Sequence, residues 1–229
     1  MSIDFIPTSE LNKIKFYILD EEENDAESVV EIKNKEIFRN NKAFNQGIYD
    51  SKLGTTDHSY ICHTCFGDKT ICGGHFGKIN LPYPVISPLF KKEVLKWLKI
   101  ICFNCGNPIL NIKKSSKIEK SHLLNEYVKL SRTTIQKFIK CIHCNTIHPN
   151  VQKDPKDHLK IYIKGENDEK EKRIYNTEIE EIFSKISNET VIKLGKDIAS
   201  HPKKFVLRVI RAPPVTIRPD IKKIKGGRS

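Results

Sequence analysis

Seven cysteines and one histidine of this chain fall into four closely spaced pairs. A Cys-x-x-Cys step places two thiolates on one tight turn, where both can reach a metal ion at about 2.3 Å, and two such pairs complete a tetrahedron with no open position. This donor set is typical of structural zinc, whereas catalytic zinc keeps one position for water. The pairs are Cys62 with Cys65, Cys72 with His75, Cys102 with Cys105, and Cys141 with Cys144.

Two combinations of these pairs are compatible with the spacing. In the sequential combination, the first two pairs bind one zinc ion and the last two pairs bind a second. In the cross-braced combination of RING domains, the first pair joins the third and the second joins the fourth. The short loop from Cys65 to Cys72 closes at a low entropic cost, which favours the sequential combination. The nearby His63, His143 and His148 are interpreted as bystanders or alternative ligands.

Disulfide bonds and free core cysteines fit the pattern less well than metal ligands do. Met1 is followed by no apolar segment typical of a secretory signal, so we expect a protein that is not secreted and whose thiols stay reduced. Unrelated core thiols would not fall into pairs of this spacing. We also expect Gly73 and Gly74 to leave room for the backbone to wrap around the first ion.

The composition indicates one large domain or two small ones and a polyanionic partner. The chain has 229 residues, of which 38% are hydrophobic and 30% charged, and this argues against an extensive core. No apolar run approaches membrane-spanning length, so no membrane is expected as a partner. The net charge of +12 favours nucleic acid, although a solvated face or biased codon usage would also give many lysines. The candidate nucleic-acid contacts are Arg218 and four lysines on one expected helix, Lys91, Lys92, Lys96 and Lys99.

The elements around the cysteine pairs are mixed helices and strands. A helix over residues 89–101 is expected to begin with Ser87 as its cap and Pro88 in its first turn, and to lead directly into Cys102. Its apolar face is expected to comprise Leu89, Val94, Leu95, Leu98 and Ile101. One or two further helices are expected within residues 113–140, between the halves of the second site.

The remaining pattern also alternates between strands and helices. We expect strands at residues 14–18 and 29–32 around an acidic helix or turn, a short strand after Gly77, a strand over 158–164 and a loop or hairpin tip over 165–173. Thr177 and Glu180 predict a capping box for a helix, and a shorter helix is expected to stop at Gly195. An apolar strand over 205–210 leads into a stiff, extended, proline-rich strand that presents Arg218. The fold class is therefore α+β.

Nearly the whole chain resembles the N-terminal clamp region of the largest subunit of multisubunit DNA-dependent RNA polymerases, of the archaeal, eukaryotic and large-DNA-virus type. The motifs that carry the resemblance occur in the family's order. They are residues 49–57, residues 62–77 with their Gly-His-Phe-Gly ending, the second Cys-x-x-Cys after a helix, residues 179–195, His201-Pro202, and the segment Pro-Pro-Val-Thr-Ile-Arg-Pro over 213–219.

The resemblance implies a zinc-stapled clamp core and clamp head that close over DNA and the RNA–DNA hybrid. Residues 1–101 would form part of the clamp core with the first zinc, residues 102–160 the clamp head with the second, and residues 161–229 the return to the core. The ligands carry over as Cys62, Cys65, Cys72 and His75, and as Cys102, Cys105, Cys141 and Cys144. The partners would be nucleic acid and the second-largest and other polymerase subunits, and the assembly would be a nucleotidyltransferase.

One departure from the family concerns catalysis. The family's magnesium-binding loop, Asn-Ala-Asp-Phe-Asp-Gly-Asp, does not occur in this sequence, so we expect Mg²⁺ only in a complete polymerase and no catalytic residue here. We therefore expect a fragment or a split subunit. The frequent Lys, Ile and Asn favour a large DNA virus, and the expected location is the nucleus, or a virion or cytoplasmic viral factory.

Two alternatives from other classes remain open at this point. A free-standing zinc-ribbon transcription accessory protein would have the same ligands and charge. A RING-like module of a ubiquitin ligase would need the cross-braced combination, and the long gap between His75 and Cys102 disfavours it.

Overall fold

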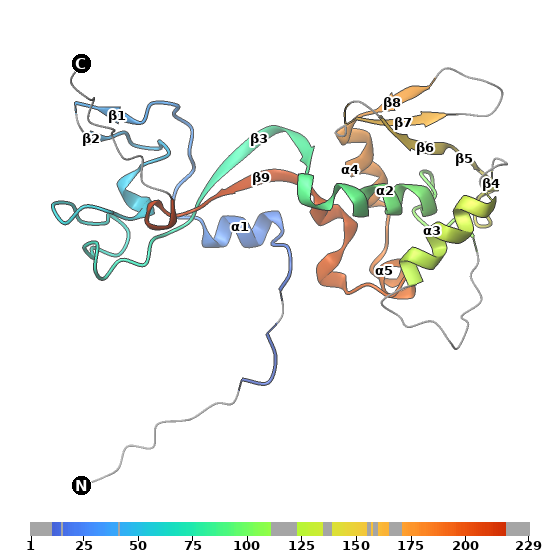
Figure 1. Cartoon of the computed structure of the whole chain (residues 1–229), viewed down its shortest axis with the longest axis horizontal. Helices are drawn as coiled ribbons and strands as arrows, with labels where there is room; N and C mark the ends of the chain where they lie inside the picture. The colour runs from blue at the N-terminus through green and yellow to red at the C-terminus, as the bar shows by residue number, and fades with distance from the viewer. Residues whose placement is uncertain are drawn as a thin grey trace, which may run out of the picture.

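A two-stranded antiparallel ribbon joins two lobes of the molecule (Figure 1). The computed structural model describes residues 11–14, 16–40, 42–110, 123–134, 139–154, 157, 160–164 and 171–218. The ribbon consists of β3 (Gly77–Ile86) and β9 (Val206–Ala212). Their register is interrupted between Asn80 and Val85. Pro82 and Pro84 lie in this interruption, where their missing N–H groups break no regular ladder.

The smaller lobe, called the first lobe, consists of residues 33–76 and 213–218. It contains few regular elements, namely β1 (Phe38–Arg39), β2 (Lys42–Ala43) and the 3-10 turns η1 (Ser51–Leu53) and η6 (Val215–Ile217). Among the described residues, its buried apolar cluster comprises only Leu53 and Val215 of the lobe and Val30 of the segment just before it. So small a core gives little stability by itself.

The other lobe, called the helical lobe, lies between the two ribbon strands in the sequence. Its helices are α2 (Lys91–Ile100), α3 (Leu123–Thr134), α4 (Asn176–Ser184) and α5 (Asn188–Lys193), with 3-10 turns η2 (Pro88–Phe90), η4 (Ile198–Ser200) and η5 (Pro202–Phe205). Its strands are β4 (Ile139–Lys140), β5 (Ile147–His148), β6 (Asn150–Lys153), β7 (Ile161–Lys164) and β8 (Lys172–Ile174), and the last three form an antiparallel sheet. Its core is extensive, which corrects the expectation from composition, and Trp97 and Phe183 are its largest fully buried side chains.

An acidic helix, α1 (Glu21–Glu27), lies along the ribbon (Figure 1). It begins with a capping box between Asp20 and Glu23. After the helix, residues 29–32 run beside β3, where the Lys78 N–H donates to Val30 O at 2.9 Å and the Ile32 N–H donates to Lys78 O at 2.8 Å. The ribbon is thereby covered by a helix and widened by a short extended segment.

The structure confirms the mixed α+β class and corrects several expected elements. Residues 14–18 contain no strand among those described, and residues 29–32 form a single bridge, between Glu31 and Lys78. The strand after Gly77 is longer than predicted, because its partner β9 lies far downstream in the sequence. Ile139 belongs to β4 and not to a helix, and Ile135 and Phe138 lie outside the described residues.

The helix before Cys102 also differs from the prediction. A 3-10 turn precedes α2, and Ser87 makes no side-chain capping hydrogen bond. Leu89 lies in that turn, which has three residues per turn, so it falls outside the α-helical stripe and is exposed. Trp97 and Ile100 are buried in its place.

The ends of α4 and β9 need similar corrections. Glu178, and not Glu180, accepts the hydrogen bond from the Tyr175 N–H that caps α4. The prediction of an extended proline-rich strand is wrong, because β9 ends at Ala212 and the chain then makes the 3-10 turn η6. Adjacent prolines cannot donate to a ladder, so pairing stops at this point. The expected hairpin is present as β7 and β8, while residues 158–159 and 165–170 lie outside the described part of the chain.

Within the described residues, no helix combines the length and apolar character needed to span a bilayer.

Candidate metal centres

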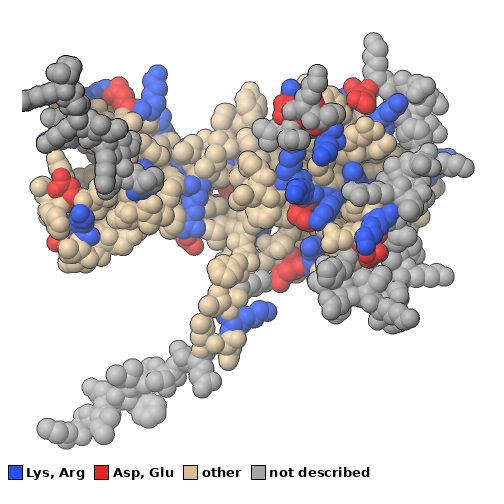
Figure 2. Space-filling view, viewed as in Figure 1, with Lys and Arg blue, Asp and Glu red and all other residues tan. Residues whose placement is uncertain are grey.

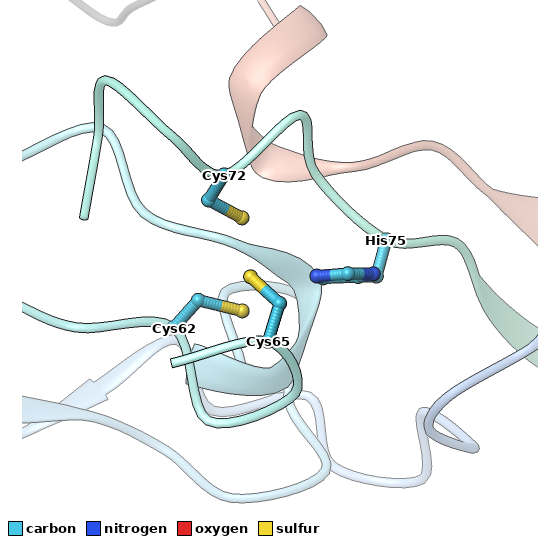
Figure 3. Close-up of side chains that lie close together, drawn as sticks. All are labelled: Cys62, Cys65, Cys72 and His75. Atoms are coloured by element: carbon cyan, nitrogen blue, oxygen red, sulfur yellow. The ribbon is translucent and has the colours of Figure 1, made fainter. Parts of the chain in front are cut away.

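The first centre lies in the first lobe, where four side chains from loops converge (Figure 3). The ligand atoms of Cys62, Cys65, Cys72 and His75 all lie within 4.8 Å of one another. The His75 ring points toward the thiols in Figure 3, and its Nε2 is buried with no hydrogen-bond partner among the described residues. A buried nitrogen without a partner is costly, and a metal bond would satisfy it. The residues present therefore fit a metal ion.

The second centre lies at the edge of the helical lobe. Helix α2 leads into Cys102, and the β4–β5 hairpin carries Cys141 and Cys144. The Sγ atoms of Cys102 and Cys144 are 3.5 Å apart, and those of Cys105 and Cys141 are 3.7 Å apart. The pairs combine sequentially at both centres, so the cross-braced arrangement required for a RING-like module is not formed.

All three Cys-x-x-Cys turns share one backbone arrangement. The N–H of the first cysteine donates to the carbonyl five residues later, as from Cys62 to Gly67 at 2.9 Å and from Cys141 to Thr146 at 2.9 Å. The residue after the second cysteine donates its N–H back to the first and has a positive φ. These residues are Phe66 at 58°, Gly106 at 69° and Asn145 at 56°.

Backbone amides also point at two of the sulfur atoms. The Thr64 N–H donates to Cys62 Sγ at 3.4 Å, and the His143 N–H donates to Cys141 Sγ at 3.5 Å. Such bonds stabilise negative charge on sulfur and orient the ligand for a metal.

The thiols of the two clusters differ in how readily they lose a proton. Burial raises the pKa of Cys102 to about 12 and that of Cys72 to about 11. Hydrogen bonding with the Thr146 hydroxyl lowers the pKa of Cys144 to about 6. Only thiolates bind metal, so an ion entering either centre must displace protons from buried thiols.

Segments distant in the sequence brace both centres. A Cβ on Gly74, whose φ is 88°, would lie 2.3 Å from Thr216 Oγ1 and 2.5 Å from Pro214 Cβ. The Thr216 hydroxyl donates to Gly73 O at 3.2 Å. At the second centre, a Cβ on Gly106 would lie 2.2 Å from the Lys185 carbonyl oxygen, directly after α4. The turn η6 and the end of α4 therefore hold the ligand loops in place.

These contacts change the explanation for the glycines at positions 73 and 74, which were expected to leave room for the backbone around the first ion. Gly74 is needed because η6 approaches it closely, whereas a Cβ on Gly73 would meet no described atom within 4 Å. Sequence reasoning missed Thr216 as a supporting residue. The Gly-Gly pair was a signal of close backbone approach, but its partner lies 142 residues beyond Gly74 and could not be named from spacing.

The three additional histidines lie outside both ligand clusters. His63 Nδ1 is 3.2 Å from Ser51 Oγ, and His143 contributes its backbone N–H. His148 is buried edge-on against the Phe103 ring, with ring centroids 5.0 Å apart. All three fit the bystander interpretation.

The residues expected to contact nucleic acid are in different environments. Lys92 is exposed, while Lys91, Lys96 and Lys99 are partly buried and Lys96 pairs with Glu93 at 2.6 Å. The Arg218 guanidinium donates to the carbonyls of Pro213 and Ile48, so it supports η6. Figure 2 shows basic side chains gathered over the visible face of the helical lobe, interspersed with acidic ones.

The sequence matches the family model for RNA polymerase Rpb1, domain 1, over residues 8–229. It is 36% identical over 214 residues to a DNA-directed RNA polymerase RPB1 homolog of African swine fever virus, covering 93% of this chain and 14% of the viral protein. It is 33% identical over 198 residues to the DNA-directed RNA polymerase subunit Rpo1N of Methanocaldococcus jannaschii, covering 80% of this chain and 14% of that protein. The Rpo1N of Methanococcus vannielii is 31% identical over 231 residues, covering 96% of this chain and 25% of the relative.

Proposed function

This chain belongs to the RNA polymerase Rpb1, domain 1, family, and from this premise we propose that it forms the N-terminal clamp part of the largest subunit of a multisubunit DNA-dependent RNA polymerase. The main support for this proposal is the match to the family model over residues 8–229, together with the grouping of all eight expected ligands into two clusters. In this role the chain takes part in DNA-templated RNA synthesis, a nucleotidyl transfer, without supplying catalytic residues. Mg²⁺ would be bound elsewhere in the complete polymerase.

We assign zinc to both centres. Three thiols with one imidazole, and four thiols, are soft donor sets that select zinc among common divalent ions. Four protein ligands leave no position for water, so both ions would be structural. On the domain division expected from the sequence, the first ion belongs to the clamp core within residues 1–101 and the second to the clamp head within 102–160.

The partners we propose are DNA, the RNA–DNA hybrid, and the second-largest and other polymerase subunits. Basic residues clearly outnumber acidic ones from residue 111 onward, whereas the two kinds are nearly balanced before it. An excess of positive charge suits contacts with phosphates, which depend steeply on salt and little on sequence. The lysines of α2, with Lys92 the most exposed, remain predicted contacts. The location we propose is the nucleus, or a virion or cytoplasmic viral factory.

Native mass spectrometry of the protein purified from its source under mild conditions tests this function. The expected result is a multisubunit assembly with RNA-synthesising activity on DNA, in which this chain or the longer polypeptide containing it carries two zinc ions. A lone 26.4 kDa species with two zinc ions would contradict the proposal and favour a zinc-ribbon accessory protein.

A further inference from the structure

His75 is the ligand of the first centre that lies closest to the ribbon in the sequence. Figure 3 shows its ring pointing toward the three thiols from the segment that leads into β3. A metal-binding histidine usually donates its other ring N–H to a carboxylate or a carbonyl group, and this bond fixes the ring. Among the described residues, the His75 ring makes no hydrogen bond. Its orientation toward the ion therefore depends on the backbone that carries it.

The backbone on both sides of the His75 side chain is held by other segments. The His75 N–H donates to Leu53 O at 3.1 Å, and the Val29 N–H, just after α1, donates to Phe76 O at 2.9 Å. The Phe76 ring is covered by Arg211 of β9, whose Cζ lies 3.6 Å from the ring centroid. This is the shortest contact between a cation and a ring in the described part of the chain. Any movement of the chain at residue 76 would cost this attraction.

The pairing of β3 with β9 does not by itself account for a cation at position 211. Arg211 lies directly opposite Lys78, and like charges at opposed positions destabilise an antiparallel pair. The Arg211 Nε is also buried with no hydrogen-bond partner among the residues that the structure describes, which is a further cost. Two carboxylates of α1 offset the charges, since Glu27 pairs with Arg211 and Asp25 with Lys78. An uncharged residue would suit the strand alone, so the contact with Phe76 is what distinguishes arginine at this position.

We propose that Arg211 is a positioning residue for the first metal centre, and that it acts through Phe76 to hold the His75 imidazole in its ligand position. This inference rests on the assignment of zinc to that centre. The stack on Phe76 joins the backbone of the neighbouring ligand to β9, and the ion pair with Glu27 joins it to α1. Retention of zinc in the first lobe thereby depends on a side chain more than a hundred residues downstream of the ligands.

Arg211→Met, introduced into the full-length subunit of the assembled polymerase, removes the guanidinium and keeps an apolar stem. We expect the first centre to lose zinc to a chelator at least about fivefold faster, because the His75 backbone loses its support. Hydrogen exchange of residues 62–77, followed by mass spectrometry during chelation, assigns the loss to this centre.

The matched control is Arg39→Met in the same lobe. Arg39 also lies over a ring, with its Cζ 4.5 Å from the Phe44 centroid, and pairs with Glu36 at 2.8 Å, but this ring is not adjacent to a ligand in the sequence. The control should lose zinc at the wild-type rate. Equal acceleration in both variants would show a general loss of stability in the lobe and overturn the inference.

A double-mutant cycle with Phe76→Leu tests whether Arg211 acts through the ring. Each single substitution should accelerate zinc loss, and the double variant should be no faster than the faster single variant. Arg211→Lys keeps a cation at this position and should restore part of the retention. Multiplied effects in the double variant, or a wild-type rate in Arg211→Met, would overturn the inference and leave the assignment of zinc intact. A wild-type first centre that holds no zinc would instead contradict that assignment.

Discussion

At the scale of single residues, the two adjacent glycines of the first centre have different environments. Gly74 faces Thr216 and Pro214 at distances that no Cβ tolerates, and its φ is 88°. Gly73 has open space. The pair therefore separates a general effect of adding a methyl group near the ligands from a specific effect on η6.

We expect Gly74→Ala to destabilise the metal-loaded chain by about 2 kcal/mol or more, because the methyl group clashes with η6 and the backbone becomes strained. Gly73→Ala should change stability by less than about 0.5 kcal/mol. Urea denaturation of both variants, with zinc content measured alongside, checks this. Equal effects of the two substitutions would show that η6 does not brace the centre.

His148 gives the second prediction at this scale. Burial lowers its pKa from 6.5 to about 4, so the folded state binds fewer protons than the unfolded state in this interval. The contribution of neutral, buried His148 to the free energy of unfolding is fully present above pH 6.5. It is lost as the pH falls toward 4, by up to about 3 kcal/mol. His148→Leu should remove this part of the pH dependence. Urea denaturation of the wild type and the variant between pH 4 and 6.5 measures the free energy of unfolding of each. The difference between the two pH profiles cancels the effect of metal loss, which is common to both proteins. Parallel profiles would show that His148 is not the group responsible.

At the scale of elements, helix α1 is attached to the ribbon mainly by charge. Asp25 pairs with Lys78 at 2.6 Å, Glu27 pairs with Arg211, and Lys204 lies 3.3 Å from Asp20 and 3.4 Å from Glu23. These partners lie on both strands and on η5, so ion pairs join the helix and its N-cap residue to three elements of the connection between the lobes. Ion pairs of this kind weaken with salt unless they are partly buried.

Lys204 is the strongest candidate to hold α1, since its side chain is only 17% exposed. Lys204→Met keeps the apolar stem and removes the charge, so we expect α1 amides to exchange hydrogen about fivefold faster, equivalent to about 1 kcal/mol. Lys193→Met is the control, because Lys193 is 71% exposed and its ammonium lies as far as 4.0 Å from the Glu189 carboxylate, so this ion pair is weak. Unchanged exchange in the Lys204 variant would mean that apolar contacts hold the helix.

Elements also show where sequence reasoning succeeds. The eight ligands could be identified because each pair is set by a spacing of three residues, and α3, α5 with its stop at Gly195, and β9 followed from local periodicity and caps. The length of β3 could not be predicted, since it depends on pairing with a strand more than a hundred residues downstream. Glu180 was expected to cap α4, but it makes a two-point ion pair with Arg208 of β9, at 2.6 and 2.7 Å. Tertiary contacts of this kind leave no periodic signal.

At the scale of the whole molecule, the two lobes depend on their metal ions to different degrees. The buried apolar cluster of the first lobe consists of two of its own residues and Val30, whereas the helical lobe has an extensive core of its own. Structural zinc contributes on the order of 10–16 kcal/mol in small modules, more than a small core can supply.

Cys72→Ser should therefore unfold the first lobe, with amides of residues 49–76 losing protection from hydrogen exchange. Cys141→Ser should disrupt residues 102–109 and 139–148 while α2 and α4 stay protected by their core. Hydrogen exchange with mass spectrometry distinguishes the two patterns. Retained protection in the first lobe of the Cys72 variant would show that its apolar contacts are sufficient without the ion.

The ribbon places the entire helical lobe between two parts of the first lobe, so the chain enters the first lobe, leaves it along β3 and returns along β9. During synthesis on the ribosome, the four ligands of the first centre emerge early, but Thr216 and Pro214 emerge only after the helical lobe is complete. The first centre can thus acquire its ion long before its brace exists. Bracing of the first centre by η6 therefore depends on folding of the inserted helical lobe, which has to bring β9 back to β3.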